Sequence, residues 1–160
     1  PSLIRVEADE ATYNIHIMIR YEIEKMMISG ELEVDDLPDK WDDMYEEYLG
    51  VRAPNRGLGV LQDIHWSMGA IGYFPTYTLG NLYSAQLLAA ARKDMPNHDD
   101  NVRRGEFGPL LEWMRDRVHR RGSILEPADL IEEATGSPPS PEAFVEYLAE
   151  KVRRLYGIAA

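Results

Sequence analysis

Hydrophobic side chains recur at three- and four-residue steps near the start of the chain, which is the spacing of an amphipathic helix. The members of this stripe are Ile4, Ala8, Ala11, Ile15, Met18, Ile19 and Met26. Gly30 follows the stripe, at the position where a left-handed residue commonly ends a helix. The pattern therefore predicts one long helix over residues 5–29.

Further helices are predicted where apolar periodicity is bounded by Pro at the start and by Gly, or for residues 76–93 by Pro96, after the end. They cover about residues 38–49, 76–93, 109–121, 127–135 and 141–156. Between them, residues 51–59 form a loop, residues 60–66 are ambiguous and residues 67–75 are rich in turn formers. Because no strand pattern or repeat is convincing, we predict an all-α fold with six or seven helices. We expect residues 1–160 to form a single unit.

Composition narrows the class of protein further. The 160 residues are 44% hydrophobic and 28% charged, an ordinary soluble composition, and no apolar run is long enough to span a bilayer. The formal charge of −11 would repel phosphate backbones. The absence of cysteine favours a reducing compartment, which we take to be the cytoplasm. These properties argue against nucleic-acid and membrane partners.

Recognisable catalytic signatures are missing from the sequence. No two of the four histidines are spaced four residues apart, so there is no HExxH, and no phosphate loop or GxSxG elbow occurs either. The histidines are His16, His65, His98 and His119. If a metal takes part, most of its ligands must lie outside this chain, so we predict no metal ligand among its residues.

A first group of polar side chains shares one face of the predicted first helix. Its members are Arg5, Asp9, Thr12, Tyr13, His16 and Arg20. Such a face is usually exposed to solvent. A binding role is the alternative, because a cation in the first turn opposes the helix dipole and Arg5 preceding Asp9 is the weaker pairing order. Arginine is also suited to bidentate binding of a carboxylate.

A second group brings an amide, a carboxylate and an imidazole together at Gln62, Asp63 and His65. Asp63 could fix a histidine tautomer, and His65 could donate to an oxyanion or move a proton. A buried structural network is the alternative interpretation. Just beyond, Tyr73 and Tyr77 flank a turn that enters a helix, where they are either core residues or oxyanion donors.

Two segments resemble signature motifs of the Taq-type metallocarboxypeptidases. Residues Ile4–Asp9 match IRxxAD, and residues Gly59–Trp66 match GxxQDxHW. The segments Gly72–Tyr83 and Gly105–Trp113 are also similar to that family. The likeness extends from Ile4 to nearly the end of the chain, and two motifs with their order and separation intact are far more specific than either alone.

This resemblance implies an all-helical enzyme that releases single residues from peptide C-termini with zinc or a related divalent ion. In the family the metal lies on an HExxH helix with a downstream glutamate, all before IRxxAD, and the enzyme is typically a homodimer. The chain would then be the C-terminal third of such an enzyme, and its start at Pro1 without an initiator Met is what we expect of a piece. We expect it to need the N-terminal part and to be inactive alone.

The resemblance also implies roles for individual residues. Arg5 would bind the terminal carboxylate of the substrate, while His65 and Tyr77 would face the scissile carbonyl and stabilise the tetrahedral intermediate. The supporting residues would be Asp9, Gln62, Asp63 and, as a weaker candidate, Tyr73. The alternative is a stand-alone helical module for interaction or oligomerisation without catalysis. An HExxH upstream in the same reading frame would discriminate between the two.

Overall fold

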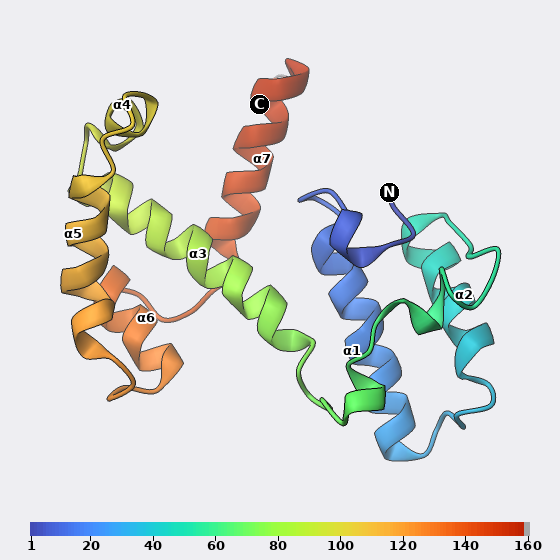
Figure 1. The fold of residues 1–160 in the computed structure, drawn as a ribbon. Helices are drawn as coiled ribbons and strands as arrows, with labels where there is room; N and C mark the ends of the chain where they lie inside the picture. Colours follow the sequence, from blue (N-terminus) through green and yellow to red (C-terminus); the bar gives the residue numbers. More distant parts are fainter. Residues whose placement is uncertain (159–160) are drawn as a thin grey trace. The chain divides into compact units, whose positions relative to one another are not determined.

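A computed structural model of the chain describes residues 1–158, and every regular element in that range is helical. Seven α-helices are joined by loops and by four short 3-10 turns (Figure 1). The helices are α1 (Tyr13–Ser29), α2 (Leu37–Leu49), α3 (Pro75–Asp94), α4 (His98–Arg103), α5 (Gly108–Arg117), α6 (Pro127–Thr135) and α7 (Glu142–Tyr156). The turns are η1 (Arg5–Glu7), η2 (Val60–Gln62), η3 (Trp66–Met68) and η4 (His119–Arg121). The predicted all-α class is confirmed.

The predicted start of the first helix is wrong. α1 begins at Tyr13, and Arg5 lies in the separate turn η1. The two are separated because the backbone of Ala8 is extended, with φ −68° and ψ 144°. The expected conflict between Arg5 and the dipole of its own α-helix therefore does not arise.

Asp9 explains where α1 starts instead. Its Oδ1 accepts hydrogen bonds from the backbone N–H groups of Ala11 (3.0 Å) and Thr12 (2.9 Å). This is a turn that aspartate forms with its own following backbone, and it leads directly into the helix. The bond from Thr12 lowers the pKa of Asp9 below its usual value. Asp9 thus has a local structural role at an exposed position.

Other boundaries follow the sequence pattern more closely. α6 has the predicted limits, and α3 differs from its prediction by one residue at each end. α5 stops at Arg117, earlier than predicted, and the remainder of that segment forms η4. α4 was not predicted, because six residues are too few to establish a period. No helix within residues 1–158 is both long and apolar enough to cross a membrane.

The described chain divides into two compact units, with the boundary inside α3. The first unit is Pro1–Leu79, and the second begins at Gly80. The interpretation of residues 1–160 as one part of a larger catalytic domain stays a prediction.

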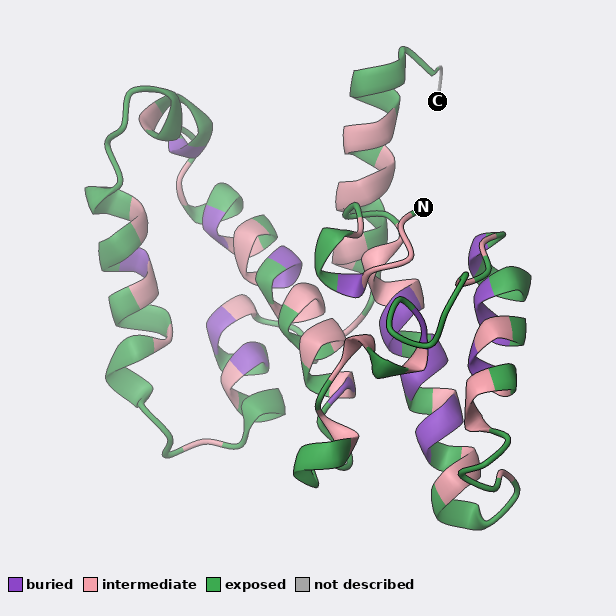
Figure 2. Ribbon diagram, turned by 45° about the vertical axis from the view of Figure 1, so that its right-hand side comes forward, coloured by how far each residue is buried: buried purple, intermediate pink, exposed green. Residues whose placement is uncertain are grey.

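The apolar core of the first unit lies between α1 and α2 (Figure 2). Its buried members are Ile19, Ile23, Trp41, Met44, Tyr45 and Leu49. The rings of Trp41 and Tyr45 stack with their centroids 5.0 Å apart. This packing fixes the rotation of α1 about its axis and so decides which of its side chains are enclosed.

The polar face of α1 is buried, so its interpretation as a solvent-exposed surface is wrong. His16 and Arg20 are 0% exposed and Glu24 is 6% exposed, whereas Met18 of the predicted apolar stripe is 53% exposed. Burial of such groups is tolerated only where they find hydrogen-bond partners. Those partners come from Tyr45 of α2 and from the segment between α2 and α3.

In the second unit, a single glutamine connects α3 to the segment between α6 and α7. The side-chain amide of Gln86 donates to Thr135 Oγ1 (3.1 Å), and to the carbonyls of Ser137 (3.0 Å) and Pro138 (3.1 Å). Its oxygen accepts the backbone N–H of Ser140 (3.2 Å). The buried apolar residues of the second unit include Ala85, Ala91, Trp113, Ile131 and Ala134.

Candidate active site

The two sequence motifs meet at Arg5 in the first unit. The backbone N–H of Arg5 donates to Gln62 Oε1 (2.9 Å), and its guanidinium donates through Nη2 to Asp63 Oδ1 (2.7 Å). Nε lies 3.3 Å from both oxygens of the same carboxylate, and Nη1 donates to Tyr13 Oη (3.1 Å). Arg5 is thus held at both its backbone and its side chain, and it is 7% exposed.

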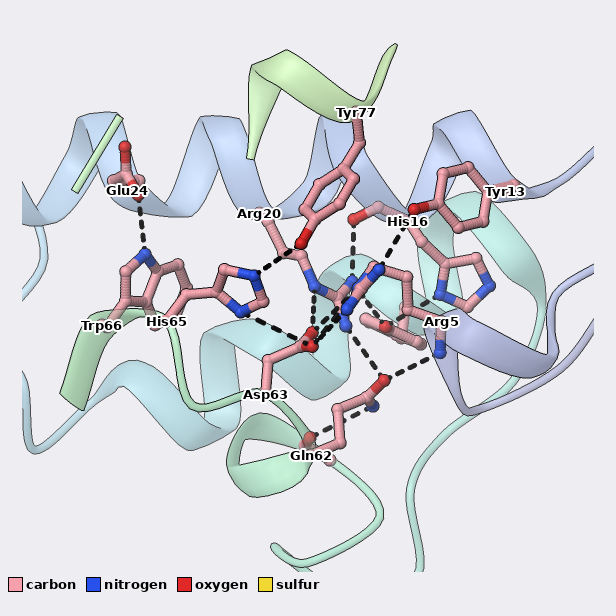
Figure 3. A network of polar contacts seen from close by, with 12 residues as sticks. Arg5, Tyr13, His16, Arg20, Glu24, Gln62, Asp63, His65, Trp66 and Tyr77 are labelled. Carbon is pink, nitrogen blue, oxygen red and sulfur yellow. Dashed lines mark hydrogen bonds and ion pairs between the residues drawn. The ribbon is translucent and has the colours of Figure 1, made fainter. Parts of the chain in front are cut away.

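Arg20, on α1, binds the same two loop residues from the enclosed side (Figure 3). Its Nε donates to Asp63 Oδ2 (2.7 Å) and its Nη2 to Gln62 Oε1 (2.9 Å). Nη1 donates to the His16 carbonyl and to Tyr45 Oη, both at 2.8 Å. The guanidinium carbon also lies 4.4 Å from the centroid of the Trp41 ring, within cation–π range.

Gln62 joins these elements through its other end. Its Nε2 lies within hydrogen-bond distance of the carbonyls of Leu3 (3.0 Å), Leu58 (3.1 Å) and Gly59 (3.2 Å). The amide orientation follows from these contacts, since only the NH₂ end can face carbonyls and only the oxygen can face donors. Gln62 therefore fixes the start of the chain, η2 and α1 relative to one another.

The charges at this position do not balance. Two guanidinium groups, Arg5 and Arg20, share the single carboxylate of Asp63. Burial alone would raise the pKa of Asp63, but hydrogen bonds from Arg5 and the charge of Arg20 hold it below the usual range. Burial alone would lower the pKa of Arg5, yet the hydrogen bond and charge of Asp63 raise it. Both partners are therefore ionised at neutral pH.

His16, which lies beside Arg20, does not change the net charge of the cluster. Burial, followed by the charges of Arg20 and Arg5, lowers the pKa of His16 to about 4. Tyr45 Oη accepts from Arg20 and lies 3.0 Å from His16 Nδ1, so its one proton points to that nitrogen. His16 is accordingly a neutral imidazole with its proton assigned to Nε2. The cluster of Arg5, Arg20 and Asp63 keeps one net positive charge.

His65 and Tyr77 form a second pair beside this cluster. His65 Nε2 lies 3.0 Å from Tyr77 Oη, and Nδ1 lies 3.7 Å from Asp63 Oδ1. A carboxylate can only accept, so it favours the tautomer with the proton on Nδ1 and the Tyr77 hydroxyl donating to Nε2. Partial burial raises the pKa of Tyr77, which keeps the phenol protonated. The Arg5 guanidinium carbon lies 4.9 Å from the Tyr77 ring centroid.

The remaining predicted residues divide between this site and its surroundings. The Tyr73 ring packs against the rings of His65 and Tyr77, with centroid distances of 5.7 Å and 5.4 Å. Tyr73 is 48% exposed. Asp9 is not among the hydrogen-bond partners of the cluster within residues 1–158, because its described bonds serve the start of α1. The structure therefore brings Arg5, Gln62, Asp63, His65, Tyr73 and Tyr77 together, and Asp9 lies apart.

Glu24 was not predicted, and Arg20 and Tyr13 were predicted only as members of the polar helix face, without individual roles. Arg20 and Tyr13 carried a partial signal, since both share a helix face with His16 in the sequence. Glu24 carried none, because an isolated glutamate on a helix is usually exposed. Within residues 1–158, no group of three or more His, Asp or Glu side chains is placed to hold a metal ion. The described residues therefore do not form a metal site by themselves.

Known proteins resemble nearly the whole of this chain. Residues 1–152 match the family model described as carboxypeptidase Taq (M32) metallopeptidase. Thermostable carboxypeptidase 1 of Thermus thermophilus is 49% identical over 157 residues, which are 98% of this chain and 31% of that protein. Carboxypeptidase 1 of Bacillus subtilis is 46% identical over 156 residues, again 98% of this chain and 31% of the relative.

Solved structures give the same result. The crystal structure of an M32 carboxypeptidase from Deinococcus radiodurans superposes with a TM-score of 0.94 at 45% identity, covering 98% of this chain and 32% of that one. A Trypanosoma cruzi metallocarboxypeptidase superposes with a TM-score of 0.91 at 38% identity, covering 96% of this chain and 31% of that one. The chain spans about a third of the length of these relatives. It belongs to the carboxypeptidase Taq family of metallopeptidases.

Proposed function

We propose that this chain supplies the substrate-binding part of a metal-dependent carboxypeptidase, which releases single residues from peptide C-termini. The observation that carries the proposal is the unbalanced charge at Asp63. Arg5 and Arg20 together exceed its charge by one unit in a mostly enclosed position. A buried charge without a partner is costly, so an anion that completes the cluster is bound favourably. The terminal carboxylate of a peptide is such an anion.

Arg5 is the member that can reach a ligand. Arginine has five N–H donors, and the described bonds of Arg5 use Nε and one donor on each terminal nitrogen. A second N–H on Nη1 and on Nη2 is left for a carboxylate. Arg20 is 0% exposed and cannot touch substrate. A site that needs a carboxylate rejects internal peptide bonds, because the unpaired guanidinium would stay uncompensated.

His65 and Tyr77 are suited to a developing oxyanion. The Tyr77 hydroxyl keeps its proton and donates to His65 Nε2 in the free state. An oxyanion is a stronger acceptor than neutral imidazole, so the phenol would turn to it in the transition state. His65 would orient the Tyr77 hydroxyl towards the scissile carbonyl, and Asp63 Oδ1 lies 3.7 Å from the other ring nitrogen of His65.

In this proposal, the metal lies in a part of the enzyme outside residues 1–158. The family is described as metallopeptidases, and we infer a divalent ion, zinc by the resemblance, held by ligands outside residues 1–158. We also infer a homodimer by the same resemblance, and a cytoplasmic location from the absence of cysteine. Without the N-terminal part, this chain alone would be inactive.

The experiment that tests the proposal is Arg5→Gln in the full-length polypeptide that contains this chain. Its readout compares peptides that end in a free carboxylate with the same peptides ending in an amide. Loss of a charged partner costs about 3 kcal/mol, so kcat/KM for the carboxylate peptide should fall about 100-fold. The preference over the amide peptide should disappear.

A matched control separates this effect from a general loss of charge. Arg115→Gln removes an exposed arginine, 49% exposed at its side chain, whose described ion pair is with Glu112. It should leave both activity and preference unchanged. An Arg5→Gln enzyme that still prefers carboxylate over amide peptides would refute the proposed role of Arg5.

A non-catalytic interaction module is the second candidate, and one helix of the second unit favours it. α7 has no buried residue, and Val145 is 60%, Leu155 64% and Tyr156 75% exposed. Exposed apolar patches mark surfaces that are covered by something else. Light scattering of the purified chain at increasing concentration tests self-association, and a constant monomer mass would exclude it for this chain.

A further inference from the structure

Glu24 is the most enclosed carboxylate of the first unit that takes no part in the arginine cluster. It lies on α1 one turn beyond Arg20 and is 6% exposed. Its Oε2 accepts the indole N–H of Trp66 (2.7 Å), and its Oε1 accepts the backbone N–H of Gly72 (2.6 Å). Both bonds are short, as expected for charge-assisted hydrogen bonds. Among residues 1–158, Glu24 forms no ion pair.

The two donors lie at the ends of one segment. Trp66 directly follows His65, and Gly72 directly precedes the aromatic run that leads into α3 and Tyr77. Gly72 has a φ of +78°, a conformation that favours glycine, so its N–H direction is set by the turn. One carboxylate therefore holds both ends of the segment from Trp66 to Gly72.

His65 and Tyr77, the catalytic pair of the proposed function, lie just before and just after this segment in the sequence and contact each other across it. His65 Nε2 and Tyr77 Oη are 3.0 Å apart. His65 adjoins Trp66, whose indole N–H donates to Glu24, and Tyr77 follows Gly72, whose backbone N–H donates to Glu24. The Phe74 ring packs against this segment, with its centroid 4.4 Å from that of the His65 ring and 5.7 Å from that of the Trp66 ring. Figure 3 shows Glu24 above the Trp66 indole and apart from Gln62.

We propose that Glu24 is a positioning residue, which sets the distance and direction of the His65–Tyr77 pair by binding Trp66 and Gly72 at once. This inference rests on the proposed function for its effect on catalysis, and on geometry alone for its effect on the pair. The two N–H donors meet different oxygens of Glu24, Oε2 for Trp66 and Oε1 for Gly72, and a carboxylate can accept on both. A neutral glutamine would place its NH₂ group against one of the donors.

The first experiment reads the pair directly. Selective nitrogen-15 labelling of histidine in the full-length polypeptide reports the hydrogen bond at His65 Nε2, with Tyr77→Phe as the reference for its loss. The His65 signals of Glu24→Gln should move in the direction of the Tyr77→Phe signals, while those of His16 stay in place. Unchanged His65 signals in Glu24→Gln would overturn the proposal, whatever the enzyme does.

The second experiment measures kinetics and rescue. Glu24→Gln should lower kcat about 10- to 100-fold, since small misplacements of catalytic groups have effects of that size. KM should stay within about twofold, because the Arg5 cluster is intact. Trp66→Phe removes the indole donor, so the double variant can turn its amide oxygen to Gly72. Its kcat should therefore exceed that of Glu24→Gln alone.

The outcomes separate this inference from the proposed function. Glu24 is structural, and the proposal is wrong, if Glu24→Gln changes kcat and KM together and lowers the melting temperature. The same holds if the effects of Glu24→Gln and Trp66→Phe on kcat are simply additive. If Arg5→Gln leaves the carboxylate preference intact, the proposed function fails instead. The His65 signals still decide the role of Glu24 in that case.

Discussion

The enclosed ion pairs around Asp63 in the first unit contrast with the exposed ion pairs of the second unit. In the first, Arg5 and Arg20 pair with Asp63, and the side chains of these pairs are 8%, 0% and 12% exposed. In the second, the pair of Arg115 with Glu112 is 49% and 58% exposed, and that of Arg120 with Asp116 is 67% and 56% exposed. Exposed pairs contribute about 0–1 kcal/mol, whereas breaking a buried pair costs about 3–5 kcal/mol.

The difference in exposure of the ion pairs indicates which unit can bind a charged ligand. Ion pairs on the surface of the second unit are solvated and weak, so they do not define a binding site for a ligand. The enclosed cluster of the first unit is fixed in geometry and leaves one positive charge over. The comparison is therefore tested most directly by changing one partner in each unit and measuring stability.

The largest effect is expected for Asp63→Asn. Removal of this carboxylate leaves two guanidinium groups facing each other in an enclosed position, which should cost about 3–5 kcal/mol of unfolding free energy. Urea denaturation of the chain measures the cost. Asp116→Asn, which breaks the exposed pair with Arg120, is the control and should change stability by less than about 1 kcal/mol. Equal effects would remove the distinction between the units.

A pH-dependent loss of stability is expected next. The pKa of His16 is about 4 when folded, below the value of 6.5 for a free histidine, so the unfolded chain binds more protons between these limits. Stability should therefore fall as the pH drops from about 6.5 towards 4, by about 3 kcal/mol at most. The lowered pKa of Asp63 adds a further loss at still lower pH, as the folded carboxylate becomes protonated.

His16→Gln isolates the histidine contribution, because glutamine does not titrate. Unfolding free energies of the variant at pH 7 and pH 5 should differ less than those of the unmodified chain. His119→Gln, at an exposed position of the second unit, should leave the pH dependence as it was. A His16→Gln chain with an unaltered pH dependence would mean that the charged form of His16 is tolerated in the core.

A smaller effect is expected for Arg20→Lys, which keeps the charge. A lysine can pair with Asp63 but cannot also serve Gln62, Tyr45 and the His16 carbonyl, and it loses the planar contact with Trp41. We expect a loss of about 2 kcal/mol by urea denaturation. Arg117→Lys, in the exposed pair with Asp94, should be close to neutral. A neutral Arg20→Lys would show that charge alone, and not the planar fork, holds the cluster.

Much of the fold could be predicted because helical signals are local. Gly30 and Gly50 end α1 and α2, and α6 has the limits that its Pro and Gly indicated. The motifs around Arg5 and Asp63 identified two segments that contact each other in the fold, and they identified the family. These features depend on residues a few positions apart, so a single sequence contains them.

The tertiary structure alone decided the rotation of α1 and the contacts that follow from it. Arg5 reaches Asp63 across 58 positions of sequence, and Glu24 reaches Gly72 across 48. Sequence periodicity placed His16 and Arg20 on a common face but could not show that this face is buried. Whether a polar face is buried depends on distant partners that satisfy its hydrogen bonds, and those partners are brought close only when the chain folds.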